Sequence, residues 1–171
     1  MRAILTALAV TLALPAAAET VTLGDLVITR PALRATPPAA PVAAGFLSVE
    51  NTGAMEDKLI GADIDPAVAG MVQLHQMAMA DGVMQMSEMT DGILLPPGAK
   101  VDLVPGGLHL MLMQMTQPLE PGQAHDVTLS FEKAGEITLA MPVLTLAEIR
   151  EAAAEMLDGM EMPEGEGELS R

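Results

Sequence analysis

One tight turn constrains the fold of this chain more than any other feature. Asp81-Gly82 lies between two runs, residues 75–80 and 83–88, in which methionine recurs at alternate positions. Asp-Gly suits a two-residue type I′ turn, because both central residues of that turn need a positive φ. A turn of two residues also fixes the register, and it pairs Ala80 with Val83, Met79 with Met84, Met77 with Met86, and His75 with Glu88.

One face of this predicted hairpin is unusually rich in sulfur. Side chains two residues apart lie on the same side of a strand. The shared face therefore carries one imidazole and four thioethers, from His75, Met77, Met79, Met84 and Met86. Directly opposed side chains have Cβ atoms about 5 Å apart. Met86 is therefore expected close to Met77 and His75.

Residues 108–115 repeat the pattern. One face of this predicted strand carries Leu108, Leu110 and Leu112, and the other carries His109, Met111, Met113 and Met115. The leucine face is the natural core face, which leaves the histidine and methionine face for another role. Bringing this strand beside the hairpin would gather two imidazoles and several thioethers into one cluster.

A soft-metal site and simple core packing are both compatible with a methionine stripe. Methionine is flexible and fills irregular gaps in cores. A histidine heads the stripe in both runs, however, and a buried histidine on an apolar face would need a hydrogen-bond partner. Imidazole and thioether suit Cu(I), whereas Ca²⁺ and Mg²⁺ take oxygen ligands. We interpret the cluster as a Cu(I) site, with Glu88 as an acceptor that orients His75.

The remaining chain predicts an all-β domain. Short alternating segments are separated by Gly- and Pro-containing turns at intervals of roughly 8–12 residues, which is typical of a β-sandwich or barrel with Greek-key connections. The first is one strand that includes 21–23 and 26–28 with Gly24-Asp25 between them, and the others are residues 45–51, 58–63, 72–75, 100–104, 126–132 and 137–143. The sequence Thr145-Leu146-Ala147-Glu148 matches a capping box and predicts a short C-terminal helix, with Gly159 as its stop.

The ends of the 171-residue chain differ from this domain. Residues 1–18 resemble a secretory signal, with Arg2, an apolar centre and a small-residue cleavage site after Ala18. We therefore expect a signal peptide at 1–18, a β-sandwich at 19–144, and a helix with a disordered acidic tail at 145–171. No other segment is apolar over the length of a membrane span, so we expect an exported, monomeric protein that is not inserted in the membrane.

Composition excludes several functions. The net charge of −15 disfavours binding to nucleic acid or to anionic membranes. Two Phe and no Tyr or Trp leave few stacking surfaces for single strands. The absence of cysteine excludes disulfides, a blue-copper site and a lipid anchor through cysteine. No arrangement typical of an enzyme is present.

The histidines and methionines also resemble a known signature. His75-x10-Met86 followed by His109-x-Met111 is similar to the H-(x10)-M-(x21)-H-x-M signature of the periplasmic PCuAC copper chaperones. The gap at residues 87–108 is one residue longer here and lies in a connection with Pro and Gly, where an insertion is tolerated. The similarity runs from about Val21 to Val143, and it includes Arg34-Ala35-Thr36-Pro37-Pro38, Asn51-Thr52-Gly53, Thr128 to Gly135, and the segment Pro105 to Leu112.

This resemblance implies a cupredoxin-like β-sandwich without enzymatic activity. It implies Cu(I) held near the surface by four residues, which map to His75, Met86, His109 and Met111. It further implies delivery of copper in the periplasm to the CuA subunit of cytochrome c oxidase, often with a Sco-type protein. Met77, Met79, Met84 and Met113 are not in the signature, and we interpret them as packing or auxiliary thioethers.

Two alternatives stay open at this point. The chain is also compatible with a periplasmic copper buffer or resistance protein, in which the tail methionines Met156, Met160 and Met162 form a weaker site. A third reading is a structural β-sandwich whose methionines only fill the core. His125 is expected to lie in a turn after Pro121-Gly122, at the surface and without a metal.

Overall fold

The computed structural model describes residues 20–80 and 82–158. Eleven strands and one helix account for most of them. They are β1 (Thr20–Leu23), β2 (Leu26–Arg34), β3 (Val42–Asn51), β4 (Asp57–Ile64), β5 (Ala69–Ala80), β6 (Val83–Glu88), β7 (Ile93–Leu95), β8 (Lys100–Leu103), β9 (Leu108–Met115), β10 (Ala124–Phe131), β11 (Gly135–Leu144) and α1 (Leu146–Asp158). The prediction of an all-β fold with a short C-terminal helix is confirmed.

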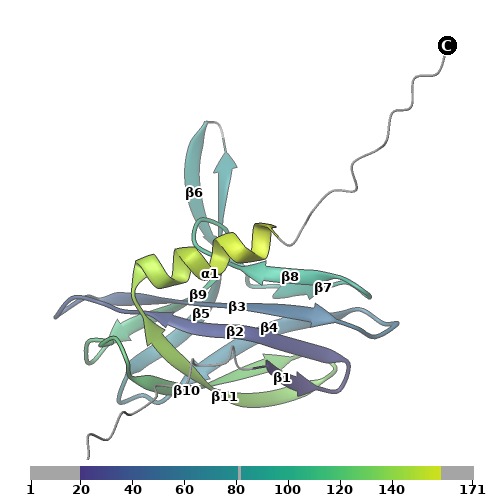
Figure 1. The fold of residues 1–171 in the computed structure, drawn as a ribbon, viewed down its shortest axis with the longest axis horizontal. Coiled ribbons are helices and arrows are strands. Elements are labelled where there is room, and N and C mark those ends of the chain that lie inside the picture. The colour runs from purple at the N-terminus through teal and green to yellow at the C-terminus, as the bar shows by residue number, and fades with distance from the viewer. Residues whose placement is uncertain (1–19, 81, 159–171) are drawn as a thin grey trace, which may run out of the picture.

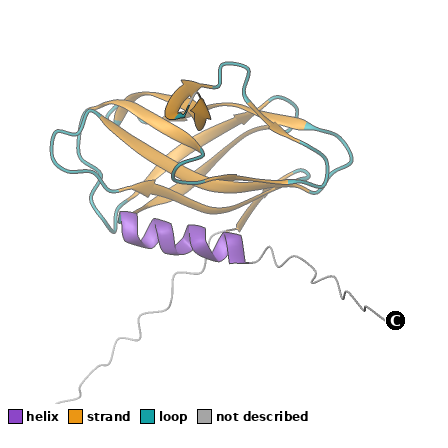
Figure 2. Cartoon of the chain, turned by 90° about the horizontal axis from the view of Figure 1, so that it is seen from above, coloured by secondary structure: helices purple, strands orange, loops and turns teal. Residues whose placement is uncertain are grey.

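The strands form one sheet that folds over a single core. Their order is β6-β5-β9-β8-β3-β2-β11-β10-β4-β7, with β1 added beside β2 and β9 also paired with β3. Most neighbours in this order are not consecutive in the chain, as expected for a Greek-key sandwich. Figure 2 shows the strands in two facing layers, with the helix along one side. Strand β11 joins two halves of the sheet. It pairs over two residues with β2, which lies in the half that runs to β6, and over eight residues with β10, which lies in the half that runs to β7.

Alternation of apolar residues explains why the layers close on each other. Side chains from both halves are fully buried, including Leu33, Leu47 and Leu110 from one half and Leu59 and Leu129 from the other. At Gly45 a Cβ would lie 3.2 Å from Leu33 Cδ2 and 3.3 Å from Leu110 Cβ. Glycine at this position therefore lets β3 approach these two leucines closely.

The elements differ from the sequence predictions in two places. The segments 21–23 and 26–28 are separate strands joined by a turn at Gly24, whose φ is +57°. Strand β7 was not predicted, because its three residues are too few to show a period. It pairs with β4 from Asp57↔Leu95 to Leu59↔Ile93.

Helix α1 begins with the predicted capping box. The backbone N–H of Glu148 donates to Thr145 Oγ1 at 3.3 Å, and the N–H of Thr145 donates to Glu148 Oε2 at 2.7 Å. Hydrogen bonds from the hydroxyl and backbone of Thr145 lower the pKa of Glu148. Ile149 packs on Ala32 and Phe46, so the helix covers part of the outer face of β2 and β3 (Figure 1).

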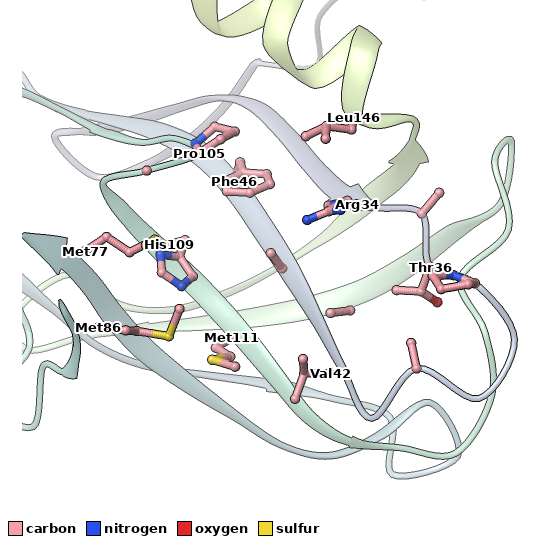
Figure 3. A pocket seen from close by; sticks show the side chains of 16 residues that line it. Arg34, Thr36, Val42, Phe46, Met77, Met86, Pro105, His109, Met111 and Leu146 are labelled. Carbon is pink, nitrogen blue, oxygen red and sulfur yellow. The ribbon is translucent and has the colours of Figure 1, made fainter. Parts of the chain in front are cut away.

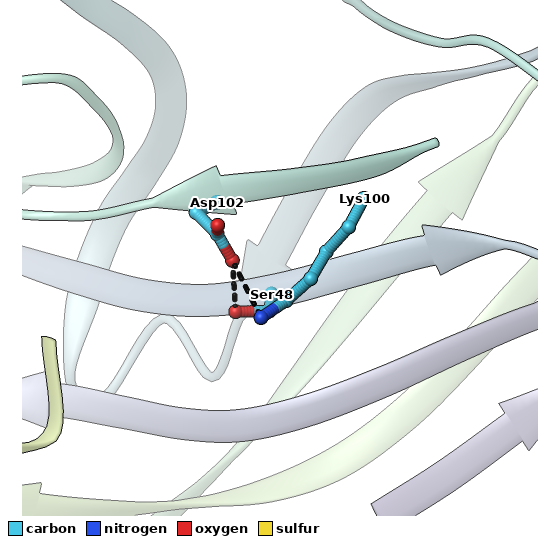
Figure 4. Close-up of polar contacts among 3 residues, drawn as sticks. All are labelled: Ser48, Lys100 and Asp102. Carbon is cyan, nitrogen blue, oxygen red and sulfur yellow. Dashed lines mark hydrogen bonds and ion pairs between the residues drawn. The ribbon is translucent and has the colours of Figure 1, made fainter. Parts of the chain in front are cut away.

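Two buried polar side chains of the sheet, Ser48 and Asp57, are well hydrogen-bonded. Ser48 on β3 donates from Oγ to Asp102 Oδ1 on the adjacent β8, and Lys100 Nζ lies 3.4 Å from the same oxygen (Figure 4). Asp57 at the start of β4 is 5% exposed and accepts from the backbone N–H groups of Lys58, Lys133 and Ala134 at 2.7–2.9 Å. The Asp57 carboxylate thereby ties β4 to the turn between β10 and β11.

The predicted signal peptide and the acidic tail from Gly159 lie outside the described residues. The side chain of Met156 and the whole of Met160 and Met162 are likewise not described. Within 20–80 and 82–158, no helix has the length and apolarity needed to cross a membrane. The domain limits proposed from the sequence stay a prediction.

Candidate metal site

Strand β5 lies between the two strands that carry the other candidate ligands. It pairs with β6 in the predicted register, in which Met79 faces Met84, Met77 faces Met86 and His75 faces Glu88. Gly82 in the turn has φ +80°, as the predicted turn requires. The register predicted from Asp81-Gly82 is therefore confirmed.

The other edge of β5 brings the two histidines together. Strands β5 and β9 are antiparallel, and His75 lies directly opposite His109. Their ring centroids are 5.9 Å apart, and the ring planes are inclined by 41°. The backbone N–H of Met77 donates to the carbonyl of Gly107 at 3.1 Å, just beyond this pair. Two runs that are distant in the sequence therefore converge, as the metal-site interpretation required.

His109 is held with one ring nitrogen available. Its ring is buried, with 6% exposed, and Nδ1 lies 3.0 Å from the carbonyl oxygen of Gly107. A carbonyl only accepts, so Nδ1 carries the proton and donates. The lone pair is then on Nε2, which is the form of imidazole that binds a metal.

His75 is held in the opposite tautomer. Its Nε2 donates to Gln73 Oε1 at 3.1 Å, which leaves the lone pair on Nδ1. Nδ1 is buried and has no hydrogen-bond partner. Burial is the main cause that lowers the pKa of His75, and the nearby His109 adds to it, while the charge of Glu88 acts in the opposite direction. A neutral imidazole with an unpartnered buried nitrogen is what a metal ligand requires.

Gln73, rather than Glu88, orients His75. The sequence interpretation gave this role to Glu88, which faces His75 across the hairpin. Glu88 is exposed and acts on His75 through its charge, and the hydrogen bond goes to Gln73. Gln73 stands two residues before His75, hence on the same face of the same strand, and this spacing was the available signal.

A cleft of about 310 Å³ opens beside His109. Met77, Met86 and Met111 line it together with the His109 ring, and Figure 3 shows these side chains gathered at one end. Ala44 on β3 pairs with Met111, and its small side chain leaves room there. His75 does not line the cleft, but it lies across the strand pair from His109.

The far end of the cleft was not predicted from the sequence. Arg34, Phe46 and Leu146 line it, and they come from β2, β3 and the first turn of α1. Nothing in the local sequence around these residues indicates that they share a cleft with His109.

Most methionines of the stripe are not core packing. Met79 is 65% exposed, Met86 is 48% exposed and Met84 is 47% exposed. In contrast, Leu110 and Leu112 on the other face of β9 are fully buried. The thioethers therefore stand on the outer side of the sheet, where simple filling of the core does not explain them.

Two placements predicted for single residues are wrong. Met115 packs against the core instead of continuing the His109 face, because Gln114 has φ +55° and interrupts the alternation. His125 lies within β10 opposite Met141 rather than in a surface turn, and its Nε2 is buried without a partner.

Charged ligands do not complete a metal site near the two histidines. Over the described part of the chain, no three His, Cys, Asp or Glu side chains gather closely enough to hold an ion. Met86 and Met111 are the signature methionines at this end of the cleft.

The fold and this end of the cleft define a PCuAC-like domain. The apo PCuAC domain from PmoF1 superposes with a TM-score of 0.63 and 28% identity, covering 74% of this chain and 99% of that domain. The copper-bound PCuAC domain from PmoF2 gives a TM-score of 0.62 and 31% identity, covering 74% and 98%.

The chain belongs to the LpqE-like family, whose description is "Putative lipoprotein LpqE-like" and whose model matches residues 26–143. A relative from Leifsonia xyli subsp. xyli, "Putative lipoprotein Lxx21020", is 38% identical over 100 residues. That match covers 58% of this chain and 59% of the relative, so the chain spans about three fifths of its length. The family description is typical of exported proteins.

Proposed function

We propose that this chain binds one Cu(I) ion through His75, Met86, His109 and Met111. The observation that carries the proposal is the pair of opposed imidazoles, 5.9 Å apart, each with one hydrogen-bonded and one free nitrogen. Met86 and Met111 stand beside His109 at the cleft. The likeness to a copper-bound PCuAC domain supports the same reading.

The donor set favours monovalent copper. Thioethers carry no proton near neutral pH, and neutral imidazole is a borderline ligand that also suits Cu(I). The lowered pKa of His75 keeps its imidazole neutral, so protons compete weakly for it. Since Met86 is half exposed, an incoming ligand could reach a bound ion and exchange with it.

Competition with a chromophoric Cu(I) chelator tests this site. The parent chain should withdraw close to one equivalent of Cu(I), and the variant H75Q/M86L/H109Q/M111L should withdraw almost none. M55L is the matched control, because Met55 is 71% exposed and lies between β3 and β4, away from the cleft. Equal binding by the quadruple variant would move the site elsewhere.

We further propose that the protein is a periplasmic metallochaperone. Its cargo would pass to the CuA subunit of cytochrome c oxidase, with a Sco-type thiol protein as a second partner. An ion held at the edge of an open cleft, by ligands that exchange without proton transfer, suits delivery better than storage. The signal-like residues 1–18 support export.

Transfer to an isolated CuA domain tests delivery separately from binding. Cu(I)-loaded protein is mixed with the apo CuA domain under mildly oxidising conditions, with a reduced Sco-type protein in a parallel sample. Appearance of the CuA absorption bands, faster than with the free chelated ion, supports a chaperone. Copper that stays on the chain in both samples would favour the alternative function, a periplasmic copper buffer.

A further inference from the structure

The outer part of the β5–β6 hairpin is an arm without a third strand. Pairing of β5 with β9 ends at Gln76↔Leu108, whereas pairing with β6 continues to Ala80↔Val83. Residues 77–80 and 83–86 therefore form a two-stranded arm, and Figure 1 shows it projecting from the sheet. A two-stranded ribbon gains little from packing on its own, so its side chains are free to serve another purpose.

The two faces of the arm differ in chemistry. One face carries Met77, Met79, Met84 and Met86, and the other carries Ala78, Ala80, Val83 and Gln85. Met79 and Met84 are an opposed pair near the tip and are 65% and 47% exposed. The last pair of the arm, Ala80 and Val83, has shorter side chains than Met79 and Met84. Packing at the tip therefore does not require two long methionine side chains.

Opposed thioethers can share one soft ion. The Cβ atoms of a cross-strand pair lie about 5 Å apart, and each methionine has three rotatable bonds. The sulfurs of Met79 and Met84 can therefore converge on a Cu(I) ion. Successive pairs on one face are two residues, about 7 Å, apart along the strand. Going inward from Met79 and Met84, the next pair on this face is Met77 and Met86, and the pair after that contains His75.

We infer that Met79 and Met84 form a second, outer Cu(I) position from which the ion moves inward to the four-ligand site. The inference rests on the proposed Cu(I) function and adds a route by which the ion reaches the four-ligand site. Two thioethers hold the ion more weakly than two imidazoles with two thioethers. At equilibrium the four-ligand site therefore fills first, and the Met79–Met84 position fills only when more metal is added. On moving inward the ion exchanges its bonds to the sulfurs of Met79 and Met84 for bonds to those of Met86 and Met111, and it gains bonds to one nitrogen each of His75 and His109. Copper stays monovalent throughout, and no proton or electron is transferred.

A titration with Ag(I), a stable ion of the same charge and softness, tests the outer position. The protein is labelled with ¹³C at the methionine methyl groups and followed by NMR. The first equivalent should shift the methyl signals of Met86 and Met111, and the second those of Met79 and Met84. In M79L/M84L these two signals are gone, so a second equivalent of Ag(I) should stay in solution in equilibrium dialysis. The shifts of Met86 and Met111 at the first equivalent should be unchanged, and the Met55 methyl serves as the exposed control.

The outcomes separate the two proposals. A second equivalent that shifts Met55 as much as Met79 and Met84 would overturn the outer position and leave the inner site intact. A first equivalent that leaves Met86 and Met111 unmoved would instead overturn the proposed function. The route is tested by stopped-flow loading from a weak Cu(I) complex: M79L/M84L should load several-fold more slowly at unchanged final affinity, and an equal rate would overturn the route.

Discussion

His75 and His109 occupy directly opposed positions on β5 and β9, and their rings lie 5.9 Å apart. The two rings are fixed in different tautomers, because Gln73 accepts from Nε2 of His75 and Gly107 accepts from Nδ1 of His109. Proton uptake by either ring would place a positive charge beside the other. Burial and the neighbouring His109 lower the pKa of His75, so this ring stays neutral more readily than a free imidazole, as a metal ligand must.

Copper affinity should depend on pH in one direction only. Burial and the neighbouring His109 lower the pKa of His75 below its usual value of 6.5. We expect an affinity that stays flat down to the ordinary imidazole value of 6.5 and falls only at lower pH, where protons begin to compete. Chelator competition at a series of pH values measures this, and an affinity that rises on acidification would contradict it.

The folding stability of the metal-free chain should also decrease as the pH falls. The unfolded chain binds a proton at His75 more readily than the folded chain does, so the free energy of unfolding should decrease as the pH falls through the unfolded value of 6.5. H75Q removes this contribution. Urea unfolding at pH 7.5 and 5.5 should therefore show a smaller pH effect in H75Q than in the parent.

Loss of Gln73 should weaken copper binding without removing a ligand. In Q73A the Nε2 of His75 loses the acceptor that fixes its tautomer, and changes of this kind typically cost 10-fold or more in metal affinity. We expect about a 10-fold weaker Cu(I) affinity. Q85A is the matched control, because Gln85 is exposed on the sulfur-free face of the arm, and it should bind as the parent does.

Bound metal should protect particular methionines from oxidation. Met86 is half exposed and should form sulfoxide readily in peroxide, whereas the fully buried Met141 should resist. One equivalent of Ag(I) should slow oxidation of Met86 and Met111 and leave the rate at Met55 unchanged. Peptide mass spectrometry gives each rate, and uniform protection of all methionines would count against a defined site.

Asp57 should contribute more to stability than Asp63, the exposed carboxylate on the same strand. D57A leaves the N–H groups of Lys133 and Ala134 without their acceptor, and loss of hydrogen bonds to a buried charged group costs roughly 2–3 kcal/mol. Urea unfolding measures the change. D63A is the control, since Asp63 is exposed on the same strand, and its effect should stay within about 0.5 kcal/mol.

Local sequence was sufficient where geometry is set by a turn or a cap. Asp81-Gly82 predicted every pair of the β5–β6 register, and Thr145 with Glu148 predicted the start of α1. The leucine and histidine faces of β9 likewise followed from alternation as far as Met113. These features depend on residues at most a few positions apart, so the sequence carries them directly.

Features that depend on distant contacts could not be derived in this way. The pairing of His75 with His109 needs β5 and β9 to be neighbours, which alternation alone does not specify. Arg34, Phe46 and Leu146 meet at the cleft only because the sheet folds over and α1 crosses it. Met115 and His125 were misplaced because a positive φ at Gln114 and the extent of β10 override the local pattern.

The two-residue turn at the end of the arm restricts how the length of this hairpin can change. One residue inserted between His75 and Met86 would move every following side chain of the strand to the opposite face of the sheet. The sulfur of Met86 would then point away from the cleft. Lengthening both strands by two residues would leave each existing side chain on its present face and would only move the tip of the arm farther from the sheet. Changes in the length of this hairpin are therefore compatible with the metal site only when both strands lengthen by the same number of residues.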